Sequence, residues 1–119
     1  MKLVIAVFIA AALVLLIAFM LAGDADAQTS TVVVIWSDTN TNPNESGYAV
    51  ERRPAIGTIW TEVGRTAPNA PTYTDATAST GSLYCYRVRA FSASGYSGYS
   101  TPDACMLIAP TGATVTVGP

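Results

Sequence analysis

The chain contains no histidine, and Lys2 is its only lysine. Without histidine, neither a Ser–His–Asp triad nor a zinc site of the usual His/Cys type can form. Charged residues make up only 12% of the 119 residues, and the formal net charge is −2, which excludes the basic surface that nucleic-acid-binding proteins carry. No spacing pairs two carboxylates for acid–base chemistry, and no glycine-rich phosphate loop is present. The sequence therefore predicts no catalytic residue, cofactor or metal ion, and no enzyme.

A long apolar run stands at the N-terminus. It extends without a break from Leu3 to Ala22, and Ala25-Asp26-Ala27 follows as the small-x-small pattern after which signal peptidase cleaves. The run is also long enough to cross a bilayer. Residues 1–27 are thus predicted to be a signal peptide or, alternatively, a retained membrane anchor formed by residues 3–22. In either case the remainder is exported, as a secreted or cell-surface domain or as an anchored domain that faces outward.

Cys85 and Cys105 are the only cysteines. In an exported protein such a pair predicts a disulfide. If the turn between the last two long strands is centred on Gly95, the two positions lie opposite each other across a hairpin. Directly facing positions can reach disulfide distance.

Beyond residue 30 the chain lacks helical periodicity. Short runs of β-branched and aromatic residues alternate with Gly, Pro, Asn and Asp, which is the pattern of an all-β domain. The longest run, Leu83 to Ser92, alternates strongly, so that Tyr84, Tyr86 and Val88 share one face. We predict strands at residues 31–37, 47–53, 58–63, 72–75, 83–92 and 103–108.

Several of these runs, in order, resemble a fibronectin type III domain. They are Trp36 in the first run, Gly47-Tyr48-x-Val50-Glu51-Arg52 in the second, and Tyr84-x-Tyr86-Arg87-Val88-Arg89-Ala90 in the longest. The resemblance places an immunoglobulin-like β-sandwich at residues 28–109 and implies that Tyr84 is a tyrosine-corner residue whose hydroxyl bonds to nearby backbone.

Apolar residues that share one face of a strand are predicted to form the core. Trp36 could instead stack on a sugar, but a tryptophan in this position favours the interior of the sandwich; Trp60 is left open between these two roles. The predicted core residues are Trp36, Tyr48, Val50, Tyr84, Tyr86 and Val88.

The sequence departs from the family at both ends of the domain. After cleavage behind Ala27, only Gln28 to Ile35 would precede Trp36, too few to form the family's first strand, whereas the tail at residues 110–119 has the pattern of such a strand. We predict that Ala113, Thr114, Val115, Thr116 and Val117 form a donor strand that completes a neighbouring copy, which would build a head-to-tail filament. Two alternatives stay open: the tail inserts into its own domain in the reversed direction, or it is unpaired because the chain is a fragment of a longer array.

The segment from Ser92 to Tyr99 is rich in Tyr, Ser and Gly, a composition that suits recognition. Tyr96 and Tyr99 are its candidate binding residues, although the same residues also make an ordinary flexible hairpin loop. The first functional expectation is a structural subunit of an extracellular fibre or surface layer, with itself as partner. The alternative is an adhesion or carbohydrate- or protein-binding module that uses this loop on a surface protein or polysaccharide. No nucleic-acid partner is expected.

Overall fold

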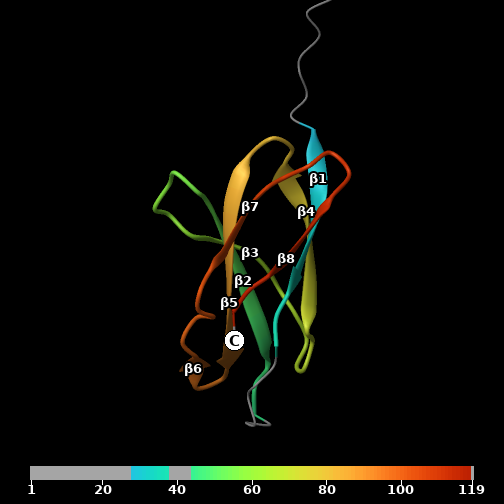
Figure 1. Ribbon diagram of the computed structural model, residues 1–119. Coiled ribbons are helices and arrows are strands. Elements are labelled where there is room, and N and C mark those ends of the chain that lie inside the picture. Colours follow the sequence, from blue (N-terminus) through green and yellow to red (C-terminus); the bar gives the residue numbers. More distant parts are fainter. Residues whose placement is uncertain (1–27, 38–43, 119) are drawn as a thin grey trace, which may run out of the picture.

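The computed structural model describes residues 28–37 and 44–118, and these residues form an all-β fold (Figure 1). The predicted all-β class is confirmed for this part of the chain, whose strands form two sheets. None of the described residues belongs to a helix that could cross a membrane, and the predicted signal or anchor segment, residues 1–27, lies outside them. The strands are β1 (Thr29–Ile35), β2 (Gly47–Pro54), β3 (Thr61–Arg65), β4 (Thr72–Ser79), β5 (Leu83–Ser92), β6 (Gly95–Tyr96), β7 (Ala104–Leu107) and β8 (Ala113–Thr116).

The strands form a three-stranded sheet and a five-stranded sheet that pack face to face. The smaller sheet has the order β4-β1-β8, and the larger has the order β3-β2-β5, with β6 and β7 both paired to β5. Figure 1 shows β1 and β4 on one side of the molecule and β2 and β5 on the other, with β8 crossing the middle of the view. Each sheet therefore has one face toward the core and one toward solvent.

The core is built from the inward-facing residues of the two sheets. Val32 and Val34 of β1 are fully buried, as is Tyr86 of β5. Trp36 packs on Tyr48 with ring centroids 5.3 Å apart. Of the residues that we expected in the core, Tyr84 is only partly buried and packs against the cluster; the others, Trp36, Tyr48, Val50, Tyr86 and Val88, are buried within it.

Three strands differ by two or more residues from the sequence-based ranges. The strand expected at 31–37 lies at Thr29–Ile35, so that Trp36 follows it. The strand expected at 58–63 lies at Thr61–Arg65, so Trp60 precedes it; its pairing with β2 is interrupted by a bulge between Val50 and Glu51. The strand expected at 72–75 continues to Ser79, because β1 pairs with it as far as Thr29↔Ser79. Small and polar residues at 76–79 carry no apolar alternation, so only the partner strand reveals this extension.

The tail strand β8 lies on its own domain. It pairs in parallel with β1, from Val32↔Ala113 to Ile35↔Thr116. The donor-strand prediction placed this segment in a neighbouring copy, whereas here it takes the reversed position within its own chain. The reason is geometric: β7 ends at the pole where β1 begins, so a parallel strand needs only the short link 109–112 and no return path.

Residues of the tail also complete the core. Val115 and Val117 are 6% and 2% exposed, and the amide of Val117 donates to the carbonyl of Ile35 at 3.0 Å. At Gly112 the backbone turns with φ of 91°, a conformation that favours glycine. The link and the two valines together close the open edge of β1.

A buried carboxylate joins the two sheets. Asp75 of β4 is 1% exposed, and its Oδ2 accepts hydrogen bonds from Arg52 Nη1 of β2 at 2.7 Å and from the Tyr86 hydroxyl of β5 at 2.9 Å. Its Oδ1 accepts from the amide and the hydroxyl of Thr77 at 2.9 and 2.6 Å. Every oxygen of this buried charge is thus satisfied, as burial of an ion requires.

These contacts keep Asp75 ionised. Burial pushes the pKa of the Asp75 carboxyl upward, but the hydrogen bonds from Thr77 and Tyr86 and the charge of Arg52 outweigh it, and the pKa is lowered. Burial and the neighbouring carboxylate raise the pKa of Tyr86, so that its hydroxyl remains a donor. A lowered folded-state pKa contributes stability above the unfolded pKa, and this stability is lost as the pH falls through the folded value.

We predict that Asp75→Asn lowers the free energy of unfolding by about 2 kcal/mol at neutral pH, since hydrogen bonds to an ionised group are stronger than neutral ones. Urea denaturation of the domain measures this loss. The variant should also lose less stability than the wild type between neutral pH and pH values below about 4, the ordinary range of an aspartate.

The matched control is Asp103→Asn, which removes an exposed partner of Arg53 3.4 Å away. Such surface pairs contribute less than about 1 kcal/mol, so this variant should stay close to the wild type. Equal losses in the two variants would contradict a special role for Asp75.

Candidate functional site

The outer face of the larger sheet carries arginine and aromatic side chains stacked in alternation. We call this set the Arg–aromatic ladder. Its members, in order along the face, are Arg53, Trp60, Arg87, Tyr99, Arg89, Tyr96, Arg65 and Phe91.

Each guanidinium group lies over a neighbouring ring. The distances from guanidinium carbon to ring centroid, in the same order, are 5.0, 4.2, 3.5, 4.6, 3.7, 6.0 and 4.6 Å. All are within the range of cation–π attraction. Two guanidinium groups lie near each of the rings of Trp60, Tyr99 and Tyr96, so a ligand that stacks on one of these rings would compete with arginines.

Strand alternation places the ladder on one face. In β5 the side chains of Arg87 and Arg89 point away from the core, since Tyr86 and Val88 point into it. The register of β2 sets Glu51 opposite Arg87 and Arg53 opposite Cys85. The outer face of the sheet is therefore both charged and aromatic.

A repeated Gly-Tyr-Ser triplet, residues 95–97 and 98–100, adds the tyrosines. Ser97 and Ser100 dock this segment along β5: their amides donate to the carbonyls of Ala90 and Val88 at 3.0 and 2.7 Å. Their hydroxyls accept from the amides of the same two residues at 2.8 and 3.0 Å. With the serines held against the strand, the tyrosine of each triplet reaches the arginines.

Three arginines of the ladder are paired with carboxylates. Arg87 contacts Glu51 at 2.8 Å, Arg65 contacts Glu62 at 2.7 Å, and Arg53 contacts Asp103 at 3.4 Å. The hydrogen bond to Glu62, together with one to Tyr96, raises the pKa of Arg65. Burial, and next a hydrogen bond to Glu51, raises the pKa of the Tyr99 hydroxyl. The guanidinium of Arg65 therefore stays charged and the hydroxyl of Tyr99 stays neutral at neutral pH.

Arg89 differs from the other three. Within the part of the chain that the structure describes, no carboxylate lies within ion-pair distance of it, and its buried Nε has no hydrogen-bond partner. It stacks between Tyr96 at 3.7 Å and Tyr99 at 4.6 Å. The centre of the ladder thus holds a positive charge that is fixed in place by its neighbours and not neutralised by them.

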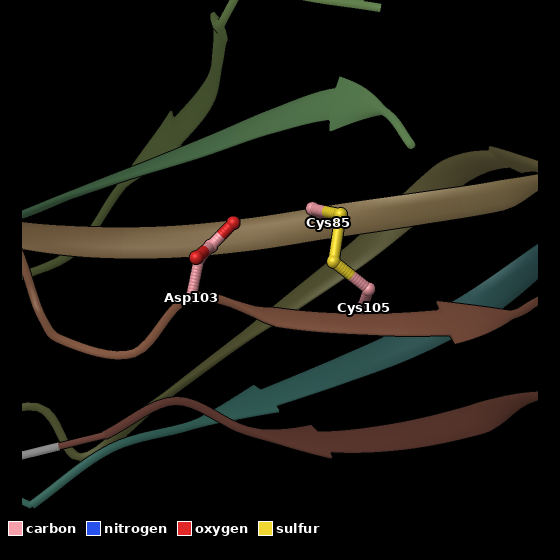
Figure 2. A group of neighbouring side chains, drawn as sticks. All are labelled: Cys85, Asp103 and Cys105. Carbon is pink, nitrogen blue, oxygen red and sulfur yellow. A yellow bond between two sulfur atoms is a disulfide. The ribbon is translucent and has the colours of Figure 1, made fainter. Parts of the chain in front are cut away.

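The disulfide lies further along the same strand. Cys85 of β5 and Cys105 of β7 are direct cross-strand partners and are bonded to each other, as predicted. Figure 2 shows this bond between the two strands, with Asp103 just before β7. The carboxylate of Asp103 lies within 4.8 Å of both sulfurs, a grouping that in other proteins can hold a metal ion. Here the sulfurs are bonded to each other and offer no thiolate, and Asp103 is paired with Arg53. The disulfide is consistent with an extracellular location.

The structure brings Tyr96 and Tyr99, the predicted binding residues, together with Trp60 on one face. Trp36 lies in the core, away from them. Tyr84 is outside the ladder: Arg52 lies 4.5 Å over its ring, and a hydrogen bond to Ser79 lowers the pKa of its hydroxyl.

The sequence-based reasoning did not identify Arg65, Phe91, Ser97 and Ser100 as parts of this site. The repeat of Gly-Tyr-Ser with a period of three residues, beside two arginines with a period of two, was the available signal for the serines. Nothing in the sequence pairs Arg65 with Phe91, because they come from different strands, β3 and β5.

No family model and no curated protein matches the chain. Among solved structures, the twitchin kinase region from C. elegans (Fn31-NL-kin-CRD-Ig26) is similar, with 26% sequence identity and a TM-score of 0.49. The match covers 54% of this chain and 11% of that one.

We predict that reduction of the disulfide lowers the free energy of unfolding by about 3 kcal/mol, since a loop of this length is released in the unfolded state; the two cysteines are 20 residues apart. Urea denaturation with and without a reductant measures the change. The double variant Cys85→Ser/Cys105→Ser is the control, because it should be insensitive to the reductant. An unchanged urea midpoint for the reduced wild type would contradict the prediction.

Proposed function

We propose that this chain is an exported fibronectin type III-like domain that acts by contact, and that the Arg–aromatic ladder binds an acidic segment of a partner protein. The strand order supports the family: β1 and β4 lie in one sheet, and β3, β2, β5 and β7 lie in the other. The parallel β8 beside β1 is where this chain departs from it.

The observation that carries the proposal is the unpaired Arg89. A guanidinium group binds carboxylates through paired N–H donors. Stacking between Tyr96 and Tyr99 holds the side chain in advance, so that little rotamer freedom remains to be lost on binding. An acidic group of a partner would supply the counter-charge that the domain itself does not provide.

The composition of the ladder suits a protein partner. Arginine, tyrosine and tryptophan are enriched in protein interfaces and dominate their hot spots. Tyr96 is 51% exposed, so part of its surface is accessible to a partner, while its hydroxyl accepts a hydrogen bond from Arg65 Nη2 at 2.9 Å. A sugar ring would need a free aromatic face, whereas each of the rings of Trp60, Tyr96 and Tyr99 already has two arginines beside it. The geometry therefore favours the protein-binding form of the adhesion-module alternative over the carbohydrate-binding form.

A titration with hexaglutamate peptide tests the proposal. We expect NMR shifts centred on residues 87–99, and we expect Arg89→Gln to weaken binding about tenfold, which corresponds to 1.4 kcal/mol. Binding should weaken with added salt, because the contact is between opposite charges near the surface.

Arg65→Gln is the matched control. It removes the same charge from the same ladder, but this arginine already pairs with Glu62. If binding depended on net charge alone, both variants would weaken it equally, and the assignment to Arg89 would fail. Shifts that lie away from the ladder would overturn the proposed function.

A second proposal is exchange of β8 between copies, which would make the domain a fibre subunit. β8 is held by a single neighbouring strand, β1, and is joined to the domain by the short link 109–112. In a second copy the same parallel ladder and the same sites for Val115 and Val117 would be available, so exchange would conserve these contacts.

Light scattering of the domain at increasing concentration tests this exchange beside a chain that ends at Ala109. Exchange predicts polymers that grow with concentration and that are absent without the tail. The variant Val115→Asp keeps the length of the tail but removes its buried side chain, and it should also stay monomeric. A monomer from the complete domain at all concentrations would contradict exchange.

A further inference from the structure

One pole of the sandwich is built from segments without charged residues and exposes aliphatic side chains. Four segments meet there: residues 28–30, 54–59, 79–83 and 107–112, which we call the charge-free pole. None of them contains an acidic or basic residue. The guanidinium of Arg53 lies at the border of the pole, where Nη1 donates to the carbonyls of Pro54, Ala55 and Gly57 at 3.2, 3.0 and 3.1 Å. Figure 1 shows the start of β1 beside the turn from β4 to β5 and the link from β7 to β8.

Hydrogen bonds fix these segments together. The amide of Thr80 donates to the carbonyl of Gln28 at 2.8 Å, and the amide of Ile108 donates to the carbonyl of Ser82 at 2.9 Å. The amide of Ala55 donates to the carbonyl of Leu83 at 2.9 Å. The pole is thus a defined surface and not a set of independent loops.

The exposed aliphatic side chains gather on this surface. Leu83 and Leu107 are direct cross-strand partners and are 48% and 63% exposed. Ile56 is fully exposed and shares with Leu83 a hollow of about 330 Å³, lined also by Pro54 and Tyr84. Single exposed aliphatic residues are ordinary, but a group of them on an uncharged surface indicates a contact site.

The N-terminal apolar run indicates what this surface contacts. The apolar run 3–22 ends only five residues before Gln28, and a link of that length reaches at most about 18 Å. If the run is retained as a membrane anchor, the first tethered part of the domain is therefore the charge-free pole, held close to the lipid surface.

We propose that the charge-free pole rests on the bilayer and inserts Ile56, Leu83 and Leu107 into its interfacial region. The occupant is a lipid surface and not an anionic headgroup in particular, because the segments of the pole contain no basic residue. Arg53 at its border is already held by the carbonyls of Pro54, Ala55 and Gly57 and by Asp103. Apolar burial supplies the attraction. β5 runs away from the pole toward Ser92, so the ladder extends outward and Tyr96 lies at the distal end.

Nanodiscs of phosphatidylcholine that hold the full chain provide the test. A gadolinium-chelating lipid broadens methyl NMR signals near the surface, and we expect loss of the Ile56, Leu83 and Leu107 signals. The internal reference is Ile35, an exposed residue at the other end of β1, whose signal should persist. Equal broadening of all four would overturn the proposal.

The variant Ile56→Ser/Leu83→Ser/Leu107→Ser separates docking from tethering. In the triple variant we expect the amide signals of residues 79–83 to reappear, because the pole no longer docks on the lipid. In the matched variant Ile35→Ser the same signals should stay broadened. Broadening that persists in the triple variant would overturn the proposal, since the tether alone would then explain it. Broadening without the gadolinium lipid, or an increase on addition of anionic lipid, would also overturn it, because a second copy or a charged headgroup would then be the occupant.

Discussion

The carboxylate of Asp75 holds the two sheets in their relative position. It comes from β4 in the smaller sheet, and its partners Arg52 and Tyr86 come from β2 and β5 in the larger one. Hydrophobic packing alone is not directional, so it would allow the sheets to slide. A buried ion tolerates no such shift, because each oxygen would lose a partner that water cannot replace there. The position of β5, and with it the face that carries the ladder, depends on this one residue.

The tail strand β8 covers an edge of the smaller sheet that would otherwise be open. Without β8, the edge of β1 would present unpaired backbone groups and leave Val32 and Val34 beside an open groove. β8 covers both by running parallel to β1, which is the direction that a short link from β7 permits. The domain thereby closes its sandwich with a segment from the opposite end of the chain.

Two surfaces of the domain have different chemistry. The pole at the start of β1 is built from segments without charged residues, whereas the ladder brings four of the five arginines, from β2, β3 and β5, together with aromatic rings. A membrane contact at one end and a protein contact centred on Arg89 would use different parts of the domain, which meet at Arg53. The disulfide between Cys85 and Cys105 lies between them on the same strand, β5, and keeps its pairing with β7 fixed.

The alternation and spacing of residues in the sequence were sufficient to predict much of the fold and part of the site. Alternation along residues 83–92 placed Tyr84, Tyr86 and Val88 on one face, and this leaves Arg87 and Arg89 on the other, because a strand turns successive side chains to opposite sides. The hairpin spacing was likewise enough to pair Cys85 with Cys105. Contacts between strands distant in sequence were not accessible in this way. Burial of Asp75, the stacking of Trp60 and Arg65 into the ladder, and the unpaired state of Arg89 each depend on residues from several strands. The direction of β8 depended on which pole β7 reaches, and that is a property of the folded sandwich and of no single segment.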